Sequence, residues 1–175
     1  EQVYYTGVGD NFENGNWLEH GEQGEVAGPA TLETQQGKGV MVRFPGNNGA
    51  ISCYLFQVSR EPPPPLPGGY TVREQVYFTG AGETIKNGDQ LEHGKQGEVV
   101  GPATSGAAEG KGVAVRFPGN KGAISCYLYQ VSRETPPPTT KQLAAQQKEK
   151  DRQAKERARE ACQQQLAAAI EAGEL

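Results

Sequence analysis

The chain has 175 residues, of which 35% are hydrophobic and 7% aromatic, and its 24 glycines and 12 prolines make up more than a fifth of it. No run approaches the ~18 consecutive apolar residues of a membrane-spanning helix, so we expect no transmembrane segment. The net charge of −4 argues against non-specific nucleic-acid binding by the whole chain, and three cysteines are too few for a disulfide scaffold.

An internal duplication organises the chain. Residues 1–61 align with residues 74–134 at a constant offset of 73 without a gap, and 43 of the 61 positions are identical. The run at 50–55, for example, recurs unchanged at 123–128. This repetition predicts two copies of one domain.

The first copy contains two runs of alternating apolar and polar residues, at 40–44 and 51–55. Such alternation is typical of half-buried strands, and the loop at 45–49 would join them as a hairpin. Shorter strands are expected at 2–6, 25–27 and 57–59. We expect the core to consist of Val3, Val26, Val40, Val42, Phe44, Ile51, Cys53, Leu55 and Val58, with their equivalents in the second copy.

About five strands in some 60 residues, without a helical period, predict a mainly β fold. The most economical arrangement is a five-stranded SH3-like barrel, because closure removes the edges that an open sheet exposes. We therefore expect two tandem SH3-like barrels, at 1–61 and 74–134. A small OB-like barrel is the alternative fold.

The copies are joined by a proline- and glycine-rich linker, residues 62–73. Its four consecutive prolines favour an extended polyproline II conformation, and Gly68-Gly69 would form a hinge. PxxP patterns occur at 62–65 and 64–67, but neither copy has the acidic, aromatic signature of a peptide-binding SH3 domain. We interpret the segment as a stiff spacer.

Residues 135–175 predict a proline-rich exit followed by one long helix. Thr139 and Gln142 fit a capping box, and Gly173 is suited to end the helix. Pairs four residues apart, Asp151–Lys155 and Arg152–Glu156, would stabilise it. Its apolar stripe is too narrow to fold onto a core, so we expect it to dock on a partner. The stripe comprises Ala154, Ala158, Cys162, Leu166 and Ile170.

Several strings in the repeats resemble a known group of sequences. The run Gly21–Val26 resembles the glycine-punctuated turn of KOW-type and Tudor-type barrels. The strings GEVxGPAT at 24–31, GKGVxVxFPGN at 37–47, the following CYL and SR, and the linker PPPPLPGGY resemble tandem repeats of dinoflagellate algae. The resemblance covers residues 1–134 and implies a lineage and a module rather than an activity. It also implies that a plastid is one compartment to consider.

The chain offers little that predicts catalysis. Each copy has one histidine and one cysteine, His20 with Cys53 and His93 with Cys126, which could form a thiol–imidazole dyad. No acidic group is marked to orient the imidazole, and the cysteines lie on inward strand faces. One histidine and one cysteine per copy do not supply the three or four ligands of a metal site. The glycine-rich loops do not open into helices, as a phosphate-binding loop requires. We expect a protein without enzymatic activity, metal or cofactor.

The aromatic residues allow two interpretations. A Tudor-like cage for a methylated cation needs three or four of them, available as Tyr4, Tyr5, Tyr54 and Phe56 or as Tyr77, Phe78, Tyr127 and Tyr129. Closure of the barrel ends is the plainer use. Trp17 is replaced by Gln90 in the second copy, so we interpret it as a contact residue in a polar loop. The expected partner-binding residues are Trp17, Tyr54, Phe56, Tyr127, Tyr129, Cys162, Leu166 and Ile170.

These observations predict a non-catalytic scaffold or accessory subunit that bridges components of a larger protein assembly. The resemblance makes a plastid photosynthetic complex, at the periphery of a photosystem, the concrete expectation, and docking on a membrane complex is compatible with it. The alternative is a nucleic-acid or methyl-lysine reader, for which the second copy has gained Lys86, Lys95 and Lys121. No signal-peptide pattern opens the chain, so we expect an intracellular or organellar protein.

Overall fold

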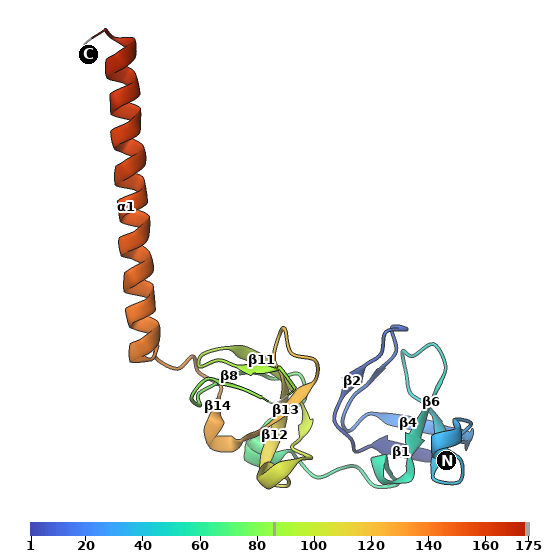
Figure 1. Ribbon diagram of the computed structural model, residues 1–175. Helices are drawn as coiled ribbons and strands as arrows, with labels where there is room; N and C mark the ends of the chain where they lie inside the picture. Colours follow the sequence, from blue (N-terminus) through green and yellow to red (C-terminus); the bar gives the residue numbers. More distant parts are fainter. Residues whose placement is uncertain (86, 174–175) are drawn as a thin grey trace. The chain divides into compact units, whose positions relative to one another are not determined.

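The computed structural model describes residues 1–85 and 87–173 (Figure 1). They form two five-stranded antiparallel sheets, two short hairpins and one long helix. By contacts the chain divides into two units, Glu1–Pro136 and Pro137–Leu175, and both sheets belong to the first. The prediction of a mainly β fold with a C-terminal helix is confirmed.

The first sheet has the strand order β6-β5-β4-β1-β7, and neighbouring strands pair antiparallel. Between β4 and β5 the register shifts at Val26 and Gly28, which makes a bulge. Within the described residues no pairing joins the edge strands β6 and β7, so closure of the sheet into a barrel is not seen. The strands are β1 (Gln2–Tyr5), β4 (Gln23–Pro29), β5 (Gly39–Arg43), β6 (Ala50–Tyr54) and β7 (Val58–Ser59), with the 3₁₀ turns η1 (Glu33–Gln35) and η2 (Leu55–Gln57).

The second sheet repeats this topology with the order β13-β12-β11-β8-β14 and the same bulge, now between Val99 and Gly101. Its strands are β8 (Gln75–Phe78), β11 (Gln96–Pro102), β12 (Gly112–Arg116), β13 (Ala123–Tyr127) and β14 (Val131–Ser132), with the turns η4 (Gly106–Ala108) and η5 (Leu128–Gln130). Each repeat also has a short hairpin, with two residues in each strand, that the sequence pattern did not predict. These hairpins are β2 (Asp10–Asn11) with β3 (Trp17–Leu18), and β9 (Glu83–Thr84) with β10 (Gln90–Leu91).

Each sheet encloses its own apolar core. Tyr5 and Phe44 meet edge to face in the first, with ring centroids 6.1 Å apart, and Phe78 and Phe117 do so in the second at 6.0 Å. The predicted inward valines contribute to these cores, fully in the second repeat and partly in the first. The prediction for Leu55 is wrong: strand β6 ends at Tyr54, the chain turns, and Leu55 is 56% exposed.

The second core also takes side chains from the linker. Leu66 and Tyr70 are buried in it, and Val72 packs against it. The 3₁₀ turn η3 (Pro67–Gly69) brings them there. The packed part of the second repeat therefore begins before residue 74, and the later half of the linker is not a free spacer.

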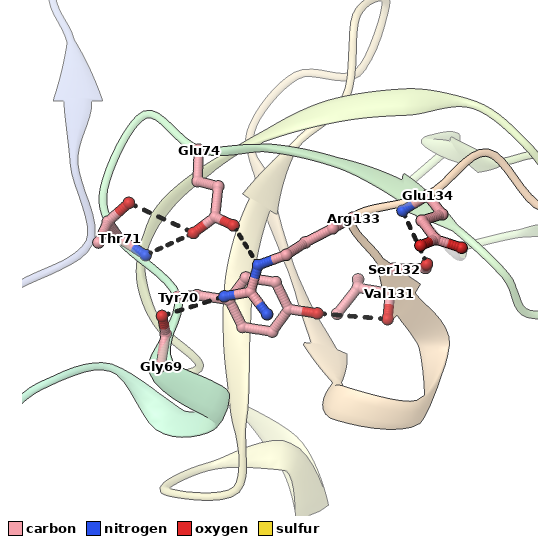
Figure 2. A network of polar contacts seen from close by, with 8 residues as sticks. All are labelled: Gly69, Tyr70, Thr71, Glu74, Val131, Ser132, Arg133 and Glu134. Atoms are coloured by element: carbon pink, nitrogen blue, oxygen red, sulfur yellow. Dashed lines mark hydrogen bonds and ion pairs between the residues drawn. The ribbon is translucent and has the colours of Figure 1, made fainter.

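An arginine clamp holds this linker segment on the second sheet, as Figure 2 shows. The Arg133 guanidinium lies 4.2 Å from the centroid of the Tyr70 ring and donates to Glu74 Oε1 at 2.5 Å and to the Gly69 carbonyl at 3.0 Å. The Glu74 carboxylate also accepts from the Thr71 backbone N–H at 2.9 Å. The Thr71 and Arg133 hydrogen bonds lower the pKa of Glu74 below its ordinary value.

The helix α1 (Thr140–Glu171) begins and ends as predicted. Thr139 Oγ1 accepts from the Gln142 N–H at 3.2 Å, and Gln142 Oε1 accepts from the Thr139 N–H at 2.9 Å, which completes the capping box. Gly173 ends the helix with φ +72°. Its length is about 50 Å. Arg152 pairs with Glu149 at 2.7 Å, one turn back, instead of with Glu156.

Two of the three cysteines lie in the cores. Cys53 and Cys126 are at most 1% exposed, and each thiol lies near a carbonyl of its own strand, whereas Cys162 is exposed on the helix. Burial raises the pKa of Cys53 to about 11 and that of Cys126 to about 12. Both core thiols are therefore protonated at neutral pH.

We expect Tyr70→Ala to destabilise the second repeat by about 3 kcal/mol, because the substitution leaves a ring-sized cavity and removes the surface under Arg133. Trp17 is the single tryptophan and lies in the first repeat, so its fluorescence follows that repeat while circular dichroism follows both. In urea, the dichroism transition should then begin at lower denaturant than the fluorescence transition. Tyr70→Phe, which keeps the ring, is the control. If both signals shift together, the two repeats unfold as one unit and this expectation is wrong.

We expect the free energy of unfolding to fall as the pH rises from about 8.5 towards 12. In this window the unfolded chain releases its thiol protons while the folded chain retains those of Cys53 and Cys126, so ionisation favours unfolding. Urea midpoints measured against pH test this. The Cys53→Ala/Cys126→Ala variant should show a shallower slope. Tyr5, whose pKa burial raises to about 12, keeps some alkaline dependence in the variant.

Candidate functional site

The same pair of aromatic rings stands at the surface of both repeats. Tyr54 and Phe56 stack with ring centroids 5.2 Å apart and an interplanar angle of 15°, and Tyr127 and Tyr129 stack with the same values. Phe56 is 80% exposed and Tyr129 is 77% exposed. The structure thus brings together, in pairs, four of the residues that the sequence predicted to contact partners. We call these two surfaces the aromatic pairs.

Hydrogen bonds to the side chain and the carbonyl of one glutamine fix the turn that carries each pair. In the first repeat the Tyr54 N–H donates to the Gln57 side chain at 2.9 Å, and the Thr6 N–H donates to the Gln57 carbonyl at 2.8 Å. The second repeat repeats both bonds, through Gln130, at 3.0 and 2.8 Å. Rings held on such a turn lose little conformational freedom when they bind, which favours their use in recognition.

A residue that the sequence predicted to lie in the core stands next in the chain to the rings of the first aromatic pair. Leu55 lies between the two ring-bearing positions on the turn and is exposed. Its equivalent, Leu128, is partly buried against the second core, and its Cδ2 lies 3.0 Å from where a side chain on Gly68 would begin. In the second repeat the linker therefore covers Leu128, whereas the equivalent Leu55 of the first repeat is left exposed. The repeats have the same residues at 50–55 and 123–128, so their sequences do not predict this difference.

Trp17 belongs to the short strand β3 instead of projecting freely from a loop, and it is half-buried. Its ring lies over Gly46, where an added Cβ would come within 2.6 Å of it. The Trp17 backbone N–H donates to Asn47 Oδ1 at 2.7 Å, and the Gln90 backbone N–H makes the same bond to Asn120 Oδ1 at 2.9 Å, so the turn is linked with or without the ring. The open side of Trp17 lines a hollow of about 530 Å³ together with Phe12 and Arg116.

The predicted helix residues Cys162, Leu166 and Ile170 are all exposed, Leu166 to 53% and Ile170 to 60%. No described residue of α1 is buried. Within unit Pro137–Leu175 these apolar side chains therefore have no core of their own.

The histidines have structural partners. The Nδ1 of His20 lies 3.2 and 3.1 Å from the carbonyls of Thr6 and Gly7, and His93 Nδ1 lies 3.2 Å from the carbonyls of both Thr79 and Gly80. Each ring thus links the turn after β3 or β10 to the residues that follow the first strand of its repeat. The neutral core thiols offer no thiolate for nucleophilic attack. Among the described residues, no three histidine, cysteine or acidic side chains gather as metal ligands.

The geometry does not assemble the cage that the aromatic residues could have formed. Tyr5 is 3% exposed and Phe78 is 1% exposed, because both rings belong to the cores. Of the lysines considered for nucleic acid, Lys121 donates its Nζ to the Asn87 carbonyl at 3.5 Å, and Lys86 lies outside the described residues. No helix in the described part of the chain is long and apolar enough to cross a membrane.

Compared with known proteins, the chain matches no family model, no curated protein and no solved structure. The likeness to dinoflagellate repeats therefore stays a prediction from the sequence.

Proposed function

We propose that this chain is a non-catalytic adaptor, a scaffold or accessory subunit that bridges components of a larger protein assembly. The observation that carries the proposal is the exposed aromatic pair, which occurs with the same geometry in both repeats. Aromatic residues are enriched at protein interfaces, and contiguous exposed apolar patches mark interaction sites. Two copies of one binding surface on one chain suit it to bridging.

The rigidity of the aromatic pairs supports this function. Each pair stands on a hydrogen-bonded turn, so binding would cost little ordering entropy. With two pairs on one chain, the second contact becomes intramolecular once the first has formed, which raises the overall avidity. Even weak contacts at each pair would then give stable attachment to a partner that offers two sites.

For the fold of each repeat we propose an SH3-like barrel. Support comes from five antiparallel strands around one core and from the bulge that bends β4 and β11. For the setting we propose a plastid complex, such as the periphery of a photosystem, and the support is the resemblance of the repeat strings to those of dinoflagellate algae.

The arrangement favours a protein surface as the partner over a methylated cation. The two rings of each pair stack at 15° and cover one another's faces, whereas a cage presents several faces to one cation. One ring of each candidate set is also not available, since Tyr5 and Phe78 are in the cores.

We expect Phe56→Ala to weaken partner capture, and Phe56→Ala with Tyr129→Ala to abolish it. Each truncation of an interface aromatic typically costs about 1–2 kcal/mol or more, and the double variant also removes the avidity. The measurement is quantitative co-purification of tagged full-length protein with its native assembly. Leu32→Ala, at another exposed apolar residue of the first repeat, is the control. Unchanged yield for the double variant would contradict the proposal, and RNA or methylated peptide in the eluate would favour the reader function.

We expect Leu166→Glu with Ile170→Glu also to reduce attachment, because burying two such side chains is worth roughly 3–6 kcal/mol before association costs. Both sheets should keep their dichroism and their urea midpoints, since the helix contributes nothing to either core. Leu143→Glu, an exposed leucine at the start of the same helix, is the control. If the double variant co-purifies at the wild-type yield, the helix is a passive appendage and the repeats alone carry attachment.

A further inference from the structure

The two repeats meet within the unit Glu1–Pro136 through a loop and the face of a strand. The Gly9 N–H donates to the Val100 carbonyl at 2.8 Å, and the Arg116 guanidinium donates to the Gly9 carbonyl at 2.8 Å. Arg116 also lies 3.7 Å from the Asp10 carboxylate. We call residues 7–10 of the first repeat its docking loop, and Val100, Gly101 and Arg116 of the second repeat its docking face.

The contact is close as well as polar. A Cβ on Gly9 would lie 3.0 Å from the Val100 carbonyl oxygen, and one on Gly101 would lie 3.3 Å from Val8 Cα. The docking face sits at the bulge of β11, where the register shift between Val99 and Gly101 interrupts the pairing with β12. The Val100 carbonyl at this bulge therefore accepts its hydrogen bond from the Gly9 N–H of the first repeat.

Because the repeats are copies, each carries a docking loop and a docking face, and the internal contact uses only one of each. The docking loop of the second repeat comprises residues 80–83, and the docking face of the first comprises Ala27, Gly28 and Arg43. Their chemistry is retained: Gly82 replaces Gly9, Glu83 replaces Asp10 and Arg43 replaces Arg116.

Exposure separates the used surfaces from the unused ones. Gly9 is buried, whereas Gly82 is exposed. Val100 is 3% exposed, whereas its counterpart Ala27 is an exposed residue. Arg43 is likewise exposed, while Arg116 is half-buried. The chain therefore shows one docking face with its occupant, and an equivalent face of matching chemistry that nothing in the described structure covers.

We propose that a second copy of this chain occupies the uncovered face. The docking loop of its second repeat, residues 80–83, sits on Ala27, Gly28 and Arg43 of the first repeat of the next copy. Arg43 then donates to the Gly82 carbonyl and pairs with Glu83, as Arg116 does with Gly9 and Asp10. The contact joins different surfaces of identical chains, so it is head-to-tail and generates a ring or a filament.

The contact between copies is weaker than the internal one for two reasons. The internal contact is intramolecular, so its two surfaces meet at an effective concentration in the mM range, which separate chains do not have. Ala27 also offers less apolar surface than Val100 does. Association should therefore depend on concentration and become evident only towards the mM range, unless an assembly gathers several copies.

The test uses the full-length chain in sedimentation velocity from about 10 µM to about 1 mM, a range set by that effective concentration. Wild type should shift progressively to larger species. Ala27→Val, which gives the first repeat the side chain of the second, should move the shift to lower concentration by roughly tenfold. Arg43→Glu and Glu83→Arg should each suppress association, since like charges then face each other across the contact.

The decisive variant combines Arg43→Glu with Glu83→Arg in one chain, which restores opposite charges between neighbouring copies. Recovery of association supports the head-to-tail contact. Both residues are exposed and outside the internal contact. Circular dichroism of each variant checks that it is folded. Failure of the double variant to recover, or a monomer at ~1 mM for both wild type and Ala27→Val, overturns the proposal. So does loss of association in Leu166→Glu/Ile170→Glu, which would assign it to the helix. None of these outcomes depends on the aromatic pairs, so the adaptor function is tested separately.

Discussion

The packing of one phenylalanine ring on one glycine is the contact on which each repeat depends. Phe44 lies so close to Gly24 of β4 that an added Cβ would come within 2.7 Å of its ring, and Phe117 lies in the same way on Gly97 of β11. The glycine lets the strand pass directly over the ring, which is then fully buried and meets Tyr5 or Phe78 edge to face. In a unit of this size a single ring is a large part of the core, so no side chain is tolerated at these glycines.

Once this core is closed, the remaining aromatic residues are free for other uses. The end of β6 and the turn that follows are held by Gln57 and by the end of β1, so Tyr54 and Phe56 do not have to pack inward. Trp17 similarly covers a turn whose backbone link survives without it in the second repeat. The division between rings that fold the repeat and rings that face solvent is therefore the same in both copies.

The sequence alone was sufficient for the features that depend on local periodicity and capping. Alternation located β5 and β6, and Thr139, Gln142 and Gly173 located the ends of α1. The sequence was insufficient where the burial of a side chain depends on residues far away in the chain. Alternation continues through Leu55, although the strand ends one residue earlier. The docking of Leu66 and Tyr70 could not be read from a proline- and glycine-rich segment with so few apolar residues.

The contact between the repeats shows why duplicated surfaces need not be duplicated in function. It is made largely by backbone groups, the Gly9 N–H and the Val100 carbonyl, which carry no signature in the sequence. One visible trace is the change from Ala27 to Val100, which places a larger side chain on the copy that is covered. In contrast, one ring of each aromatic pair, Phe56 or Tyr129, is exposed, and the internal docking leaves both available. Docking that links the two repeats limits how far one pair can move from the other. Such a restraint raises the effective concentration of the second pair after the first has bound, which is the physical requirement for bridging through individually weak contacts.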